Sequence, residues 1–199
     1  MNSSRRSVLL ATVTGLLAIA PLTVAQTPPP PPPPPAQPVA VPPAAPPDIR
    51  ARSAGGAFGF AGGDRERGAL SAAIERTVSN VNFLIRGIAR GRLTDRNQPY
   101  GHITIRFVPG FIEIQAEGRP LFRSPDTGAA GNWHGPDNAD YRIVQRVDGD
   151  SIVQEVGNSD GTRRNVFRVS PDGHTLTMSV RVTSSRLPQA LEYTLTYRR

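Results

Sequence analysis

The C-terminal end of the chain alternates apolar and polar residues with a period of two. The apolar positions are Leu176, Met178, Val180 and Val182 in one segment, and Leu191, Tyr193, Leu195 and Tyr197 in the next. A period of two places successive side chains on opposite faces of a β-strand. The pattern therefore predicts two strands that share one apolar face.

Similar alternation predicts eight strands in the second half of the chain. They cover residues 103–107, 111–116, 119–123, 141–147, 151–156, 163–169, 174–183 and 190–198. Turns rich in Asp, Asn and Gly separate most of them, because these residues tolerate the backbone angles of tight turns. Residues 124–140 are predicted to form a polar loop. We expect a mainly β domain, an antiparallel meander of about eight strands that forms a barrel or a strongly curved sheet.

One N-terminal amphipathic α-helix is predicted ahead of the strands. Its apolar positions recur at spacings of three and four residues, as on one face of a helix. They are Leu70, Ile74, Val78, Val81, Ile85 and Ile88. Gly91 is the expected end of the helix. This stripe should be buried, either across an open side of the sheet or as a plug at one end of a barrel.

The first 67 residues are predicted to lie outside the folded domain. A basic start at Arg5 and Arg6, an apolar run over residues 8–20 and small residues up to Ala25 are the parts of a secretory signal. We expect cleavage after Ala25 and export to the periplasm or the extracellular space, by the general secretory or the twin-arginine route. Residues 26–67, first proline-rich and then glycine-rich, should be a disordered linker. The predicted domain is then 68–199.

Composition excludes several kinds of site. The chain has no cysteine, so the fold has no disulfide framework. The formal net charge is +7, with arginine as the only strongly basic residue type, but no concentrated basic stripe indicates nucleic-acid binding. His102, His134 and His174 lack metal-ligand spacing. We therefore expect no cofactor, no metal and no nucleic-acid partner, and we expect a monomer.

The C-terminal motifs resemble a known superfamily. The turn and strand DGDSIVQE at 148–155, the Asp-Gly turns and the terminal YTLTYRR at 193–199 resemble the C-terminal meander of the lipocalin and fatty-acid-binding-protein superfamily. The chain also resembles a group of exported bacterial proteins with a signal, a proline-rich spacer, a helix and a β-rich end. The resemblance implies a lipocalin-like β-barrel whose interior accepts an apolar ligand.

Two features depart from the pattern of fatty-acid-binding proteins. Those proteins carry a helix pair between the first strands, whereas one helix ahead of all strands is predicted here. They bind the ligand carboxylate with an arginine two residues before the terminal tyrosine, whereas Leu195 stands before Tyr197 here. The resemblance therefore implies a barrel without that arginine.

Strand alternation predicts which side chains would line a cavity. The predicted lining residues are Phe107, Tyr141, Ile143, Phe167, Met178, Tyr193 and Tyr197. On the strand at 163–169, Asn165 shares a face with Phe167, and Arg164 shares the other face with Arg168. Because Phe167 belongs inside, Asn165 is expected inside as a lone hydrogen-bonding group and the two arginines outside.

The loop at 132–140 is a second candidate site. Trp133 offers a ring for stacking on a sugar, and His134, Asp137 and Asp140 could bind a metal. The alternative is a polar loop pinned to the barrel rim by a buried tryptophan. Both interpretations remain open at this stage.

Three functions fit this organisation. The first is an exported, non-catalytic binding module for a small apolar or amphipathic ligand of the cell envelope, favoured by an empty apolar interior of roughly 300 Å³ or more. The second is a structural or interaction protein held on its proline-rich spacer, favoured by a filled interior. The third is a hydrolase, which would need His134 within reach of an acidic or hydroxyl partner inside a cleft.

Overall fold

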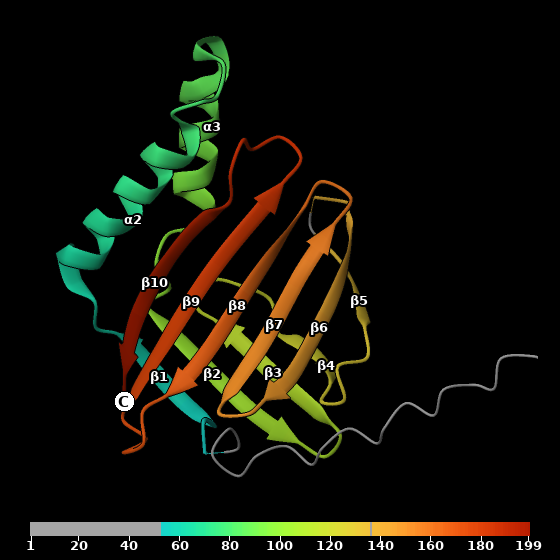
Figure 1. Cartoon of the computed structure of the whole chain (residues 1–199). Helices are drawn as coiled ribbons and strands as arrows, with labels where there is room; N and C mark the ends of the chain where they lie inside the picture. Colours follow the sequence, from blue (N-terminus) through green and yellow to red (C-terminus); the bar gives the residue numbers. More distant parts are fainter. Residues whose placement is uncertain (1–52, 136) are drawn as a thin grey trace, which may run out of the picture. The chain divides into compact units, whose positions relative to one another are not determined.

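The computed structural model describes residues 53–135 and 137–199. These residues form ten antiparallel strands and two helices, arranged as a nearly closed β-barrel (Figure 1). The strands are β1 (Gly56–Phe60), β2 (His102–Val108), β3 (Phe111–Ala116), β4 (Phe122–Pro125), β5 (Gly131–His134), β6 (Asp140–Asp148), β7 (Ser151–Asn158), β8 (Gly161–Val169), β9 (Thr175–Ser184) and β10 (Leu191–Arg198). The helices are α2 (Gly63–Val78) and α3 (Phe83–Arg96).

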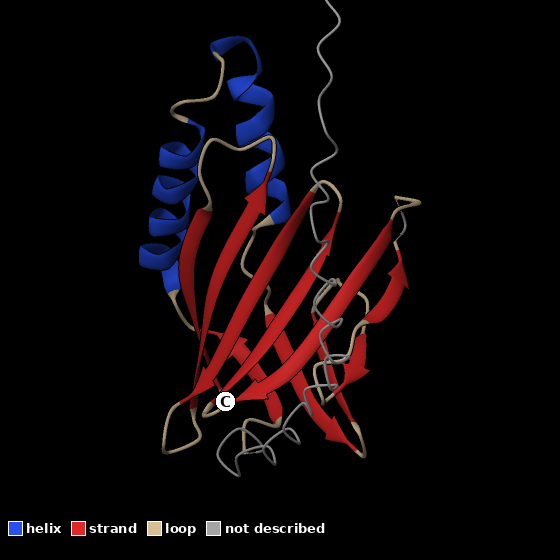
Figure 2. Ribbon diagram, turned by 45° about the vertical axis from the view of Figure 1, so that its right-hand side comes forward, coloured by secondary structure: helices blue, strands red, loops and turns tan. Residues whose placement is uncertain are grey.

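The sheet curls until its two ends meet. The strand order is β4-β3-β2-β1-β10-β9-β8-β7-β6-β5, so β4 and β5 are the end strands. The hydroxyl of Ser124 on β4 donates to Oε1 of Gln145 on β6 at 3.1 Å, and an isolated bridge joins Thr127 to Arg146. The curvature of the sheet and the helices beside it are visible in the turned view (Figure 2). The predicted antiparallel β-barrel class is therefore confirmed.

The barrel interior is lined mainly by apolar side chains. Leu176, Met178, Leu195 and Tyr197 are buried, as the alternation of β9 and β10 predicted. Phe58 and Ile105, from β1 and β2, join them in one cluster. Burial of this continuous apolar surface is the main stabilising contribution to the fold.

Two strands were missed by the eight-strand prediction. β1 lies inside the predicted linker, and its five residues include three glycines or alanines in GAFGF, too few apolar positions for a clear alternation. β5 lies inside the predicted polar loop and is only four residues long. β4 is shifted from the predicted 119–123 to Phe122–Pro125.

The folded region also begins earlier than predicted. Because β1 and the first turn of α2 precede Gly68, the predicted boundary at residue 68 is too late. The predicted signal at 1–25 and the proline-rich part of the linker lie outside the described residues.

The single predicted helix is a pair of helices. Helix α2 ends at Val78 and the chain then turns. Asn82 caps the start of α3, because its side chain accepts a hydrogen bond from the Leu84 N–H at 3.0 Å. The predicted stripe is buried at Leu70, Ile74, Val78 and Val81, but Ile85 and Ile88 are 55% and 59% exposed. Gly91 does not end the helix, since α3 continues to Arg96.

The helix pair lies between β1 and β2. One of the two expected departures from fatty-acid-binding proteins is therefore wrong, because those proteins also carry a helix pair between their first strands. Helix α2 packs Leu70 and Ile74 against Leu191 of β10. In the described part of the chain, neither helix has the length and apolar character needed to cross a membrane.

Candidate functional site

A belt of polar side chains crosses the apolar inner face of the barrel. Asn165 on β8 lies opposite Gln154 on β7, and Gln154 lies opposite Gln145 on β6. All three are buried. Arg163 extends the belt along β8, and Ser124 continues it to β4. We call these five residues the interior polar belt.

Arg163 is the centre of the belt. Its Nε donates to Oδ1 of Asn165 at 3.0 Å, its Nη1 to Oδ1 of Asn97 at 2.8 Å, and its Nη2 to the hydroxyl of Tyr193 at 3.1 Å. The guanidinium also lies 5.8 Å from the ring centre of Tyr100. Four neutral groups from β8, β10, the end of α3 and the following segment thus fix its position.

Among the described residues, the positive charge of Arg163 has no negative partner. In residues 53–135 and 137–199, ten ion pairs form and none includes Arg163. A guanidinium has five N–H groups, and the three bonds above use one on each nitrogen, so within the described residues Nη1 and Nη2 each keep a second N–H for another acceptor. Burial lowers the pKa of Arg163, but the oxygens of Tyr193 and Tyr100 outweigh that effect and raise it overall, so the group stays charged.

The contacts of Arg163 join the barrel wall to α3. Asn97 follows the last residue of α3, and its Nδ2 donates to the Leu93 carbonyl at 2.8 Å. The Tyr193 hydroxyl donates to the same Asn97 Oδ1 at 3.0 Å. Burial raises the pKa of Tyr193, so it remains a neutral donor. The cationic group therefore lies directly beneath the end of α3.

The predicted lining residues lie on the inner face, with different degrees of burial. Ile143, Phe167, Met178 and Tyr197 are buried, and Phe107 and Tyr193 pack against the same core. Tyr141 lies at the rim, where its hydroxyl donates to Oδ2 of Asp137 at 2.6 Å. That these residues line a ligand stays a prediction.

The inner and outer faces of β8 are as predicted. Asn165 and Phe167 are buried, while Arg164 pairs with Glu155 at 3.4 Å and Arg168 with Asp150 at 3.3 Å on the outer face. Asn165 is not a lone hydrogen-bonding group, however, because it accepts from Arg163 and donates to Gln154.

The loop with Trp133 forms the turn of the β5–β6 hairpin. Trp133 packs against Phe122 and Tyr141, with ring centres 5.4 and 5.2 Å apart. Nδ1 of His134 lies 2.8 Å from Oδ1 of Asp140, and both side chains are more than half exposed. In the described part of the chain, no group of three or more potential metal ligands comes together. Trp133 is half-buried on β5, and whether this segment acts as a binding site or as a pinned rim loop stays a prediction. His134 meets an acid on the surface, outside both of the hollows described below.

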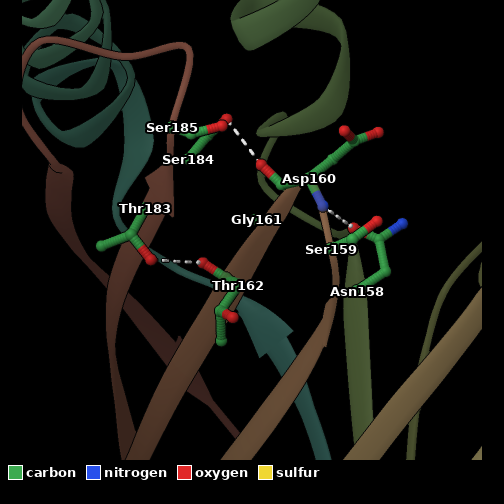
Figure 3. Close-up of a pocket in the computed structure, with 8 residues that line it drawn as sticks. All are labelled: Asn158, Ser159, Asp160, Gly161, Thr162, Thr183, Ser184 and Ser185. Atoms are coloured by element: carbon green, nitrogen blue, oxygen red, sulfur yellow. Dashed lines mark hydrogen bonds between the residues drawn. The ribbon is translucent and has the colours of Figure 1, made fainter.

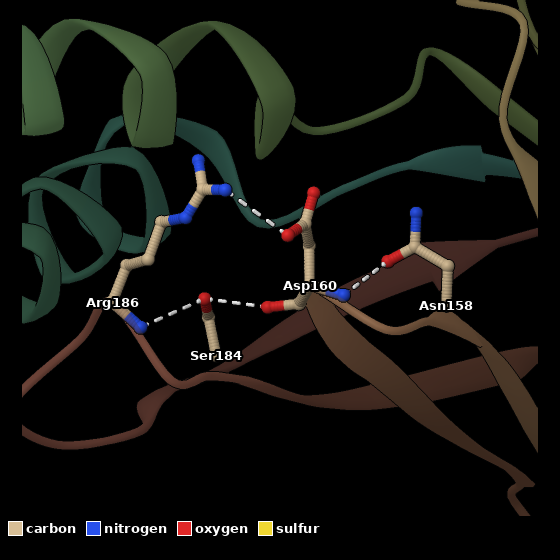
Figure 4. Close-up of polar contacts among 4 residues, drawn as sticks. All are labelled: Asn158, Asp160, Ser184 and Arg186. Carbon is tan, nitrogen blue, oxygen red and sulfur yellow. Dashed lines mark hydrogen bonds and ion pairs between the residues drawn. The ribbon is translucent and has the colours of Figure 1, made fainter.

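Two hollows open on the outer surface. One, of about 300 Å³, lies between the β7–β8 turn and the β9–β10 loop, and hydroxyl, amide and carboxylate groups line it (Figure 3). The polar groups around this hollow bond to one another. The Asp160 carbonyl accepts a hydrogen bond from the Ser184 hydroxyl at 2.7 Å, and the Asp160 carboxylate accepts one from Arg186 at 3.1 Å (Figure 4). The other, of about 250 Å³, lies on the sheet around Arg164 and Arg181. Hydrogen bonds at the first hollow therefore hold the β7–β8 turn against the β9–β10 loop.

Sequence reasoning missed Arg163 and Gln154. The alternation that placed Asn165 inside also places Arg163, two residues earlier, on the same face. Gln154 could be found only from the strand register, which pairs it with Asn165. Asn97 and Tyr100 were beyond reach, because their position depends on how α3 returns to β2.

No protein-family model matches the chain, and no curated protein matches it either. Several solved structures are similar to the chain. A fatty-acid-binding protein of Echinococcus granulosus is 13% identical, with a TM-score of 0.45 over 74% of this chain and 97% of that chain. A Schistosoma mansoni fatty-acid-binding protein in complex with arachidonic acid is 12% identical, with a TM-score of 0.44 over 75% of this chain and 98% of that chain.

A further match is a heat-soluble (SAHS) protein of Ramazzottius varieornatus. It is 13% identical, with a TM-score of 0.49 over 74% of this chain and 96% of that chain. Each of these TM-scores is below 0.5, so the function is argued from the residues of this chain.

Proposed function

We propose that the protein is a non-catalytic binding module for a small amphipathic ligand with an anionic group. The observation that supports this most is Arg163: it is a permanent cation at the edge of an apolar interior, and in the described part of the chain its hydrogen-bond partners are neutral and use three of its five N–H groups. A planar guanidinium matches a carboxylate or phosphate with two parallel hydrogen bonds. The arginine missing at Leu195 is thus replaced by one on another strand.

The ligand would approach beneath α3. The side chains of α3 are exposed or half-buried, so its outward displacement would uncover Leu93 and break the bonds of Asn97 to Arg163 and Tyr193. The two described hollows are external and do not supply the empty apolar interior that would favour ligand binding, so room for an apolar tail would have to come from this displacement. The tail would then contact the inner-face residues Phe107, Tyr193 and Tyr197.

The test is a binding measurement with two matched ligands and two matched variants. Hexadecanoate and hexadecan-1-ol share an apolar chain and differ in charge. We expect hexadecanoate to bind the wild-type protein about tenfold or more tightly than the alcohol, and Arg163→Met to abolish that preference. Arg164→Met, the neighbouring residue on the outer face, is the control and should retain it. Equal binding by Arg163→Met and wild type would rule out the assigned role.

Export and attachment to the envelope are part of the proposal and rest on the sequence. The basic start, the apolar run and the small residues before Ala25 support a cleaved signal. The measurement is the mass of the mature protein recovered outside the cytoplasm, which should begin at Gln26. We also expect this protein to be a monomer, and its elution volume in gel filtration tests that.

A second function is favoured by the exposed end of α3. Phe83 and Leu84 are 76% and 72% exposed, and they lie beside Ile85 and Ile88 on the same helix. Helix α3 also carries four arginines and one aspartate. A helix that combines apolar and cationic side chains suits an anionic lipid surface better than a second copy of itself, because two copies would repel. We propose that this end of α3 attaches the protein to anionic lipid.

Sedimentation with lipid vesicles tests this second function. The wild-type protein should bind phosphatidylglycerol vesicles and not phosphatidylcholine vesicles. The double variant Phe83→Ser, Leu84→Ser should lose this binding, whereas Leu121→Ser, at another exposed apolar residue, should not. Undiminished binding by the double variant would exclude α3 as the attachment surface.

A further inference from the structure

Arg163 sets the direction of the hydrogen bonds that run through Asn165 to Gln154. A guanidinium can only donate, so the Asn165 atom 3.0 Å from Arg163 Nε has to be the acceptor Oδ1. Asn165 therefore presents its Nδ2 to Gln154, whose atom at 2.8 Å has to be the acceptor Oε1. Arg163 therefore determines, through Asn165, which way the side-chain amide of Gln154 points.

This orientation leaves a buried donor without a partner. Gln154 is 3% exposed, and its Nε2 has no hydrogen-bond acceptor in residues 53–135 and 137–199. The facing residue does not supply one: Oε1 of Gln145 accepts from Ser124, and no bond joins it to Gln154 Nε2 among the described residues. Buried donors in folded proteins are almost always paired, since an unpaired one destabilises the fold. An acceptor from outside these residues is therefore expected next to Gln154.

We propose that this acceptor is part of the ligand, a hydroxyl or carbonyl oxygen a few bonds away from the anionic group that Arg163 holds. The inference rests on the proposed function. Arg163 lies opposite Val156 and Gln154 opposite Asn165, so Arg163 and Gln154 are diagonal neighbours across β7 and β8. Such positions are about 7–8 Å apart at Cα, and both side chains bond to Asn165, which lies between them.

A 3-hydroxy acid has the chemistry that the two groups require. Its carboxylate accepts from Arg163, and its hydroxyl oxygen accepts from Gln154 Nε2. The hydroxyl proton can be donated to the ligand's own carboxylate, so no further acceptor from the protein is needed. The alternative occupant is a buried water, which commonly bonds to polar groups that lack other partners.

The experiment compares hexadecanoate with 3-hydroxyhexadecanoate on three proteins: wild type, Gln154→Met and Gln115→Met. Methionine has nearly the shape of glutamine without its donor, and Gln115 lies exposed on β3 as the matched control. We expect wild type and Gln115→Met to bind the hydroxy acid about tenfold more tightly than the plain acid. Gln154→Met should bind the two acids equally.

The outcomes separate this inference from the proposed function. One outcome is that the wild-type protein binds the two acids with equal affinity and still binds both more tightly than hexadecan-1-ol, in a way that depends on Arg163. In that case the proposed function stands and the occupant beside Gln154 is water. If neither acid binds, the proposed function and this inference both fail. Should Gln154→Met not fold, the side-chain amide resonances of the wild-type protein decide. One glutamine resonance must shift with the hydroxy acid and not with hexadecanoate, and an identical response to both acids would overturn the inference.

Discussion

Nη1 of Arg163 donates to Oδ1 of Asn97 at 2.8 Å and thereby joins β8 to the end of α3. The same Oδ1 accepts from the Tyr193 hydroxyl at 3.0 Å. The interior cation and the helix above it are thus held by one amide oxygen. Because that oxygen is neutral, the position of Arg163 is fixed while its charge remains available to a ligand.

Asn97→Asp should reduce the binding of anionic ligands. The aspartate keeps an acceptor oxygen for Arg163 and Tyr193, but it also supplies the negative charge that a ligand would otherwise provide. We expect the affinity for hexadecanoate to fall about tenfold, equal to ~1.4 kcal/mol, in isothermal titration.

The control for this prediction is Asn82→Asp, the same substitution at the other end of α3. Asparagine and aspartate cap a helix N-terminus about equally, and Asn82 is remote from Arg163 in the barrel. Its affinity should match that of wild type. The loss of the bond from Asn97 to Leu93 affects stability, so affinities are compared at a temperature at which both variants are folded. An unchanged affinity in Asn97→Asp would contradict the prediction.

Glu66 of α2 hydrogen-bonds to β10 at Thr196, next to the last residue that β10 pairs with β1. Its carboxylate accepts from the Thr196 N–H and from the Thr196 hydroxyl, both at 2.7 Å. Glu66→Ala should lower the free energy of unfolding by about 1.5–3 kcal/mol, because both donors lose a charged acceptor. Glu75→Ala, which removes an exposed ion pair with Arg90, should cost less than about 1 kcal/mol. Urea unfolding measures both, and equal losses would show that Glu66 acts only as a surface charge.

Much of the barrel follows from local alternation. Seven of the eight predicted strands lie where the structure has β2, β3 and β6–β10, because each has several apolar residues at a spacing of two. β1 and β5 are too short for that signal, and they are strands because long neighbours pair with them. The pairing of β1 with both β2 and β10 is a tertiary effect that no local pattern encodes.

The candidate site was less accessible from sequence. Alternation could assign Arg163 to the inner face, but an inward arginine is normally paired with a carboxylate, and sequence does not reveal that its partners are neutral. The exposure of Ile85 and Ile88 was missed for a related reason. Their spacing continues the stripe of α2, and only the turn at residues 79–82 separates them from the core.

The division of the predicted helix gives a matched pair of substitutions. Ile74 is 3% exposed and packs against Leu191, whereas Ile88 is 59% exposed. Ile74→Ala should lower the free energy of unfolding by about 2–5 kcal/mol, through lost burial and a residual cavity. Ile88→Ala should change it by less than about 0.5 kcal/mol. Similar losses in chemical denaturation would mean that Ile88 itself is buried in solution.

His134 should make the β5–β6 hairpin sensitive to pH. The hydrogen bond to Asp140 is the main cause that raises the pKa of His134, with a smaller contribution from the bond to Asn138. Since the folded-state pKa lies above the ordinary value of about 6.5, the stabilising contribution is fully present below that pH. It is lost as the pH rises through the raised pKa.

Proton NMR of the imidazole measures this shift directly. In the wild-type protein His134 should titrate above about pH 6.5, and amide exchange in β5 should accelerate as it loses its proton. Asp140→Asn should return the pKa toward the ordinary value. Asp137→Asn should lower it less, because Asp137 makes only a minor contribution and is bonded to Tyr141. An equal effect of the two substitutions would show that the general negative charge of the turn, and not the bond to Asp140, sets the protonation of His134.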